Sequence, residues 1–377
     1  MSLTWNFTIQ DNSPFVNYSP FADGGLANGW QPWYTKSGFL KEPGEGGDGD
    51  GYHITSLPGA SFSLEFHGTG VNLYGTTNSS YAVLIDSVEQ KLPAVSKDLI
   101  YQTTSLQDGP HNLTVTVSPK AKQQFAFDRV VVFSPRQVSI HSFFRNFIEV
   151  KRNSPFIRHL PTPAFYDNSD PRLTYSGNWK TGNAPGIPNA TVTHNFQQTK
   201  SSGSSMSMTF SGAVGVAING PVLWGDWIYT VELDGTKTKY NASTFWKVPD
   251  ALRFFQAGLD PNSSHTITLA NPSDGMTLSL NSVTLFKVPG AVDIAESASG
   301  SATSKLSSSA LAGSSAAPHS SPAAPTESAG NTAGNTTSAG NSAAPSATGT
   351  GGAVKEGAGR VGIVGVAALG LVLLSLI

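Results

Sequence analysis

Short runs of alternating apolar and polar residues dominate the first 290 residues of the chain. In SFSLEFHGTGVNLYG (61–75), Phe62, Leu64 and Phe66 share one face, and SMSMTFSGAVGVAING (205–220) repeats the pattern with Met206, Met208 and Phe210. Gly, Pro, Asn and Asp separate the runs. Period-two alternation bounded by turn-forming residues predicts half-buried antiparallel strands. Since no stretch of this region carries a long amphipathic helical pattern, we predict an all-β fold.

The alternating blocks occur twice in the same order. DNSPFVNYSP (11–20) returns as DNSDPRLTYSG (167–177), YAVLIDS (81–87) as YTVELDG (229–235), and FAFDRVVVFSP (125–135) as LSLNSVTLFKVP (278–289). An internal repeat of this length indicates two copies of one domain. We therefore predict two tandem β-sandwiches, residues 1–136 and 164–290, joined by a connector, residues 137–163.

Composition changes sharply after the second repeat. Residues 291–352 consist almost entirely of Ser, Ala, Gly, Thr, Pro and Asn, which bury too little apolar area to offset the entropy of ordering. A segment of this kind is typical of a disordered, O-glycosylated stalk. Residues 353–377 follow it and end in VGIVGVAALGLVLLSLI, an apolar C-terminal helix in our prediction.

This tail predicts attachment to a membrane. Small residues around Gly351, a polar spacer and an apolar run are the three parts of a GPI signal, with Gly349 and Ser346 as other attachment points. A single membrane span and an apolar helix of a soluble protein are the alternatives.

Localisation is expected at the cell surface. MSLTWNFTIQ is not a signal peptide, so we expect a leader upstream of the given start, and a tail-anchored protein is the alternative. N-glycosylation sequons, which are acceptors only in the secretory pathway, occur at Asn6, Asn17, Asn78, Asn112, Asn189, Asn241, Asn262 and Asn335.

Charge and cysteine content exclude several classes of protein. Cysteine is absent, so disulfides, thiolate catalysis and Cys-based zinc sites are excluded. The net charge is −2 with 13% charged residues, which gives no basic surface for nucleic acid. We predict no cofactor; structural calcium on the acidic loop holding Glu42, Glu45, Asp48 and Asp50 is a weaker alternative to a solvated loop.

Motifs of catalysis are also missing. The sequence has no G-x-S-x-G nucleophile elbow, Walker A motif or H-E-x-x-H. His111 and His265 take matching positions at strand entries, and their phase predicts a structural role. Asp86 and Asp234 end matching strands, and Asp-Gly after Leu233 is a hairpin signal, so we interpret both as turn residues.

Aromatic residues supply the candidate ligand-binding site. Aromatic rings stack on the C–H faces of sugars while neighbouring polar groups bind the hydroxyls. The segment 219–227, NGPVLWGDW, replaces a short TTNSS in the first repeat, so we predict contacts from Trp224, Asp226 and Asn219, with Trp33 and Tyr34 as further candidates. The matching Trp30 and Trp179 are interpreted as core, and strand phase predicts an inward Trp227.

These motifs carry a family resemblance over residues 4–135 and 164–290. The order D-N-S-P…Y-S-P, [ST]-F-x-F-x-G-x-G-V-x-L-[YF]-G, Y-x-V-x-[ILV]-D and G-x-H-x-[LI]-x-[VL] resembles the jelly-roll, galactose-binding-like domains found in tandem in fungal (basidiomycete-type) cell-surface proteins. The first repeat matches throughout, whereas the second departs at DNSDP and SGAVGVAING. The resemblance implies the fold more than an activity.

Together these observations favour a membrane-anchored extracellular glycoprotein that binds carbohydrate or cell-wall polysaccharide without catalysis. A structural or adhesive surface protein without a specific ligand is the first alternative. A carbohydrate-active enzyme is the second, disfavoured by the lack of a nucleophile, metal or paired-carboxylate motif.

Overall fold

The computed structural model describes residues 4–92, 97–135, 160–189 and 191–289, and every regular element in these ranges is a strand. The prediction of an all-β fold is therefore confirmed for the repeats. Among the same residues no helix could cross a membrane. The expected stalk and tail lie outside the described ranges, as do Asn335, Gly351 and residues 137–159 of the expected connector.

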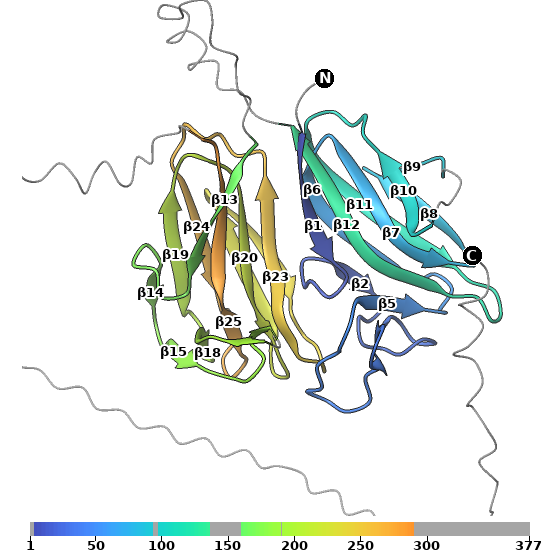
Figure 1. Cartoon of the computed structure of the whole chain (residues 1–377), viewed down its shortest axis with the longest axis horizontal. Coiled ribbons are helices and arrows are strands. Elements are labelled where there is room, and N and C mark those ends of the chain that lie inside the picture. Colours follow the sequence, from blue (N-terminus) through green and yellow to red (C-terminus); the bar gives the residue numbers. More distant parts are fainter. Residues whose placement is uncertain (1–3, 93–96, 136–159, 190, 290–377) are drawn as a thin grey trace, which may run out of the picture. The chain divides into compact units, whose positions relative to one another are not determined.

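Two sheets form the first repeat (Figure 1). One has the order β10 (Leu99–Thr103), β7 (Gly70–Thr77), β12 (Phe125–Pro135), β5 (Gly51–Thr55), β3 (Gln31–Tyr34) and β4 (Gly38–Phe39), with β1 (Thr4–Gln10) also paired to β12. The other has the order β2 (Asn17–Ser19), β6 (Ser61–Gly68), β11 (Gly109–Ser118), β8 (Ser80–Ile85) and β9 (Val88–Glu89).

The second repeat is built from four hydrogen-bonded sheets. The first has the order β13 (Thr162–Asp167), β26 (Ser282–Lys287), β20 (Ala213–Val222) and β23 (Val248–Ala257). The second has the order β14 (Thr174–Ser176), β19 (Ser205–Phe210), β24 (His265–Ala270), β21 (Ile228–Leu233) and β22 (Thr236–Asn241). Short strands complete it: β15 (Lys180–Gly182), β18 (Phe196–Thr199) and β25 (Leu278–Leu280) in one sheet, β16 (Pro188–Asn189) and β17 (Val192–Thr193) in another.

Strand pairings show that the repeat in the sequence is a repeat in the fold. The strand order of one sheet in each repeat corresponds strand by strand: β2–β6–β11–β8–β9 in the first and β14–β19–β24–β21–β22 in the second. In the other main sheet, β10–β7–β12 of the first repeat corresponds to β23–β20–β26 of the second. Single hydrogen bonds are also conserved between the copies: the Tyr18 hydroxyl donates to the Asp11 carbonyl at 2.7 Å, and that of Tyr175 donates to the Asn168 carbonyl at 2.7 Å.

The core follows the predicted periodicity. The alternate residues of β6 and β19 are all buried, and so are their partners on β7, β8, β11, β20, β21 and β24. Trp30 is fully buried, and its indole Nε1 donates to the carbonyls of Ser19 and Ser61. Trp179 is partly buried, and its Nε1 donates in the same way to Ser176 and Ser205. A buried indole needs such partners, so both rings act as core residues, as expected.

Turn chemistry explains the matching hairpins. Asp86 and Ser87 have φ values of 52° and 67°, and Asp234 and Gly235 have 50° and 82°. Two consecutive residues with positive φ define the tight hairpin turn whose twist matches that of paired strands. The prediction that Asp86 and Asp234 are turn residues is thus confirmed.

Aromatic contacts join the two repeats. Phe7 on β1 stacks on Phe255 of β23 with ring centroids 3.9 Å apart, and Trp5 lies 4.7 Å from the ring of Phe286. Ser13 donates a hydrogen bond from its hydroxyl to the Leu252 carbonyl at 2.5 Å. The two repeats therefore share one continuous cluster of buried apolar side chains. The strand β13 begins at Thr162, inside the segment expected to be connector.

Candidate ligand-binding site

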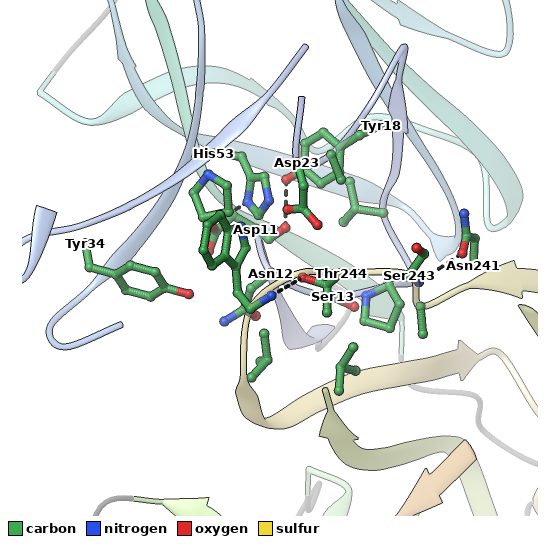
Figure 2. A pocket seen from close by; sticks show the side chains of 18 residues that line it. Asp11, Asn12, Ser13, Tyr18, Asp23, Tyr34, His53, Asn241, Ser243 and Thr244 are labelled. Atoms are coloured by element: carbon green, nitrogen blue, oxygen red, sulfur yellow. Dashed lines mark hydrogen bonds and ion pairs between the residues drawn. The ribbon is translucent and has the colours of Figure 1, made fainter. Parts of the chain in front are cut away.

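A cavity of about 60 Å³ lies where the two repeats meet (Figure 2). The first repeat lines it with the turn after β1, with the loop before β3, and with side chains of β3 and β5. The second repeat adds the end of β20 and the loop between β22 and β23, residues 242–247. This volume accommodates a few water molecules or ligand hydroxyl groups.

A buried carboxylate and imidazole form one side of the cavity. Asp11 Oδ2 lies 2.8 Å from His53 Nδ1, and the His53 ring stacks on Tyr18 at 4.5 Å. Burial raises the pKa of Asp11, while the hydrogen bond with His53 opposes that rise. The pair is therefore held in place from three directions, by β5, β2 and the turn after β1.

A second carboxylate, that of Asp23, comes from the loop between β2 and β3. Its Oδ2 accepts a hydrogen bond from the backbone N–H of Phe245 at 3.2 Å, which ties the first repeat to the second. Burial raises the pKa of Asp23, and the charge of His53 opposes this. Two buried carboxyl groups thus lie near one imidazole, so each favours a proton or a hydrogen-bond donor.

Tyr34 on β3 presents the third polar group. Its ring is clamped between Gly47 and Gly51, since a Cβ at Gly47 would lie 2.2 Å from the ring. Figure 2 shows its hydroxyl directed toward the side of the cavity that carries Asp11 and Asn12. Burial, together with the negative charges of Asp11 and Asp23, raises the pKa of Tyr34, so the hydroxyl stays protonated.

The acidic loop of the first repeat holds the loop 242–247 in place. The N–H of Gly44 donates to the Phe245 carbonyl at 2.6 Å, and the N–H of Lys247 donates to the Glu45 carbonyl at 2.8 Å. The Glu45 carboxylate accepts from the backbone N–H groups of Lys41 and Glu42, and Asp48 pairs with Lys36. Within the described ranges no three His, Asp or Glu side chains are grouped to hold a metal ion. The carboxylates of Glu45 and Asp48 therefore bind partners of the first repeat, and the backbone of Gly44 and Glu45 binds the second repeat.

An exposed aromatic pair continues from this loop. Trp224 and Phe245 are 58% and 46% exposed, and their ring centroids are 5.1 Å apart. Phe245 lies between Thr244 and Trp246, both of which line the cavity. Exposed rings beside a small polar cavity can provide an apolar stacking face and hydrogen-bonding groups together.

The five predicted ligand-binding residues are not all in one place. Tyr34 lines the cavity and Trp224 belongs to the aromatic pair. Trp33 lies on the opposite face of β3 and packs against Tyr52 at 5.7 Å. Asp226 is buried, and its Oδ2 accepts a hydrogen bond from Arg253 at 2.6 Å.

Asn219 lies within β20 and not in a loop. The strand was expected to end near Ile218, but it continues to Val222 through two irregularities in its register with β23. Gly220 still pairs with Ala251, and on β20 only Pro221 falls in an irregularity, so both residues belong to the strand. The loop is therefore only residues 223–227.

The prediction of an inward Trp227 is wrong, because this side chain is 44% exposed. Strand phase would place it beside Tyr229, but Arg253 lies over that ring at 5.4 Å and is itself fully buried with Asp226. The guanidinium and its carboxylate occupy the interior there, so the indole lies at the surface.

The two matching histidines are structural, as predicted. His111 binds Asp86 at 2.7 Å and the Gln107 carbonyl at 2.8 Å, and His265 binds Asp234 at 2.6 Å and the Asp260 carbonyl at 2.9 Å. Both ring nitrogens are used in each copy, so neither imidazole is available as a base.

Sequence reasoning missed most of the cavity. Asp11, Asp23 and His53 were not candidates, and neither was the segment from Asn241 to Trp246. The sequence carried no signal for Asp11, because DNSPFVNYSP aligns with DNSDPRLTYSG so that Asp11 matches Asp167. Only the structure matches Asp11 with Asn168, through the hydrogen bonds from Tyr18 and Tyr175.

The hydroxyl groups of Ser13 and Tyr18 in the cavity wall both have partners other than His53. A nucleophile requires a hydrogen bond to its base. Ser13, a hydroxyl in the cavity wall, donates to Leu252, and the Tyr18 hydroxyl donates to Asp11. Among the residues described here His53 bonds only to Asp11, and neither of these hydroxyl groups is bonded to it.

No protein family model matches the chain, and no curated protein matches it. Solved structures similar to parts of it include a two-domain esterase active on acetylated mannans, co-crystallised with mannopentaose, at 14% identity and TM-score 0.28, covering 40% of this chain and 45% of that one. A Paenibacillus xanthan lyase matches at 14% identity and TM-score 0.24, covering 77% and 25% of the two chains. The tandem CBM22 domain of a Paenibacillus barcinonensis protein matches at 11% identity and TM-score 0.20, covering 72% and 94%.

The chain thus spans less than half of the esterase and about a quarter of the lyase. Scores this low carry no argument about function. The case for a site rests on the cavity and the aromatic pair beside it.

Proposed function

We propose that the folded repeats bind a saccharide where they meet, without catalysis. The observation that carries this proposal is the polar cavity lined by Asp11, Asp23 and Tyr34, whose wall includes both chain neighbours of Phe245, a member of the exposed Trp224–Phe245 pair. A sugar ring would stack on the aromatic pair, and its hydroxyl groups would enter the cavity, where carboxylates accept hydrogen bonds and the tyrosine hydroxyl donates.

A glycan array tests the proposal with the full chain produced in a bacterial host, so that no asparagine is glycosylated. We expect binding to a restricted set of saccharides. Trp224→Ala and Phe245→Ala should each weaken it by about 1–3 kcal/mol, roughly tenfold or more in Kd. Both rings are exposed, so the melting temperature should change little.

Phe165→Ala is the matched control. Phe165 is an exposed aromatic residue on β13, away from the cavity, and its removal should leave binding unchanged. An array without any reproducible signal would instead support the alternative of a structural or adhesive protein.

We further propose that the folded repeats belong to a glycoprotein that its C-terminal tail holds at the outer face of a membrane. The seven sequon asparagines within the described ranges are all exposed, which supports passage through the secretory pathway. Release from membranes by a phosphatidylinositol-specific phospholipase would identify a GPI anchor. An intact peptide containing residues 373–377 on the membrane-bound form would instead identify a span or a tail anchor.

A further inference from the structure

We propose that the bound saccharide is a cationic amino sugar, whose free amine enters the cavity and binds between Asp11 and Asp23. This inference rests on the proposed function and names the chemical class of its ligand.

The charged side chains of the cavity wall favour a cationic ligand. Its charged side chains are Asp11, Asp23 and His53, and no Lys or Arg is among the described residues that line it. Even a protonated His53 would leave one negative charge uncompensated when both carboxylates are ionised. A ligand ammonium group supplies that charge and three hydrogen-bond donors, and charge-assisted hydrogen bonds are the strong ones. A sugar carboxylate would add a like charge and be rejected.

Tyr34 provides an independent reason to expect a ligand. Its side chain is only 7% exposed, yet within the part of the chain that the structure describes its hydroxyl has no hydrogen-bond partner. Hydroxyl groups in protein interiors are normally paired with protein or water, so this one is free to bind a group that enters the cavity. The hydroxyl can accept a hydrogen bond from an ammonium group or donate one to a neighbouring sugar hydroxyl.

Size distinguishes an amine from its acetylated form. The cavity volume of about 60 Å³ accepts an amine and an adjacent hydroxyl group. An acetamide adds three heavy atoms and removes the positive charge. The pyranose ring remains outside in either case, on Trp224 and Phe245.

Three hexasaccharides with the same β-1,4-linked glucose-type backbone test the inference. They differ only at the second carbon, which carries a hydroxyl, an acetamide or a free amine. Isothermal titration calorimetry with the unglycosylated full chain, at a pH where the amine is charged, should give a Kd for the amine form at least about tenfold lower than for the other two.

Two substitutions locate the preference. Asp23→Asn keeps the oxygen that accepts the Phe245 N–H and removes the charge, so it should reduce the preference for the amine to less than about threefold. Tyr34→Phe should weaken the amine form several-fold without affecting the fold. Asp48→Asn is the matched control, because it removes one exposed carboxylate on the neighbouring loop and should leave the preference intact.

Each outcome has one meaning. Equal affinity for the three hexasaccharides overturns the amino-sugar inference but leaves saccharide binding standing. An equal loss in Asp48→Asn and Asp23→Asn attributes the preference to diffuse charge and also overturns it. Absence of binding to these probes and to the wider glycan array overturns the proposed function itself.

Discussion

His111 and Asp86 illustrate how single residues stabilise each repeat. The imidazole bridges the Asp86 carboxylate and the Gln107 carbonyl, while the other oxygen of Asp86 accepts the N–H of Asn112 at 2.8 Å. The same three contacts recur around His265 and Asp234 in the second repeat. The carboxylate therefore fixes the hairpin after β8 to the start of β11.

Replacing this carboxylate should change the titration of the histidine. Burial disfavours the charged imidazole of His111, but the hydrogen bonds that it donates to Asp86 and the Gln107 carbonyl outweigh burial and raise its pKa. Asp86→Asn should therefore lower the pKa of His111, as measured by NMR titration of the ring. Asp234→Asn is the control, because it lies in the other repeat and should leave the pKa of His111 unchanged.

Stability should follow the same linkage. Because the pKa of His111 is raised in the folded state, its contribution is fully present below pH 6.5, the ordinary value, and is lost as the pH rises through the folded pKa. Asp86→Asn should cost about 1 kcal/mol at mildly acidic pH and less above neutrality. A cost that grows with pH would contradict this assignment.

At the scale of elements, the strands were predictable and the site was not. Period-two alternation is a local property, so β6, β8, β19 and β21 could be predicted from the residues within them. The cavity unites Asp11 and His53 of the first repeat with the segment 241–246 of the second, and these distant parts of the chain share no pattern. The error at Trp227 has a similar origin, since strand phase cannot reveal that Arg253 fills the interior beside Tyr229.

The loop between β22 and β23 links the site to glycosylation. Asn241 and Ser243 both line the cavity, and they are the first and third residues of an N-x-S sequon. Asn241 is exposed, and its Oδ1 accepts the N–H of Ser243 at 2.9 Å. A glycan on Asn241 would therefore occupy the mouth of the cavity.

Protein from a secretory eukaryotic host should accordingly bind a saccharide ligand more weakly than protein from bacteria. Asn241→Gln in that host should restore the affinity. Asn262→Gln removes a sequon on another exposed loop and should not. Mass spectrometry establishes occupancy at each site, and undiminished binding with Asn241 fully occupied would contradict the placement of the ligand.

At the scale of the whole molecule, the repeats are joined by aromatic packing as well as by sequence. Trp5 and Phe7 on β1 contact Phe255 and Phe286, while Phe15 stacks near Tyr240 at 5.7 Å. The candidate site needs this contact, because its wall comes from both repeats. The cavity therefore depends on residues of both repeats and is complete in neither alone.

Separated repeats should show what this junction contributes. The fragments 1–136 and 160–290 each contain a complete set of paired strands and buried side chains of their own, so each fragment should unfold cooperatively. Each should also be less stable than it is in the intact chain, because separation exposes Trp5 and Phe7 on one fragment and Phe255 and Phe286 on the other.

Mixing the fragments should restore part of the stability, as measured by chemical denaturation, and analytical ultracentrifugation should detect a complex. Phe7→Ala in the first fragment should weaken that complex by about 1–3 kcal/mol, whereas Val88→Ala, an exposed residue on β9, should not. If the fragments do not associate and each is as stable as it is in the intact chain, the aromatic contact contributes nothing to stability. If either is unfolded alone, the two repeats are one cooperative unit.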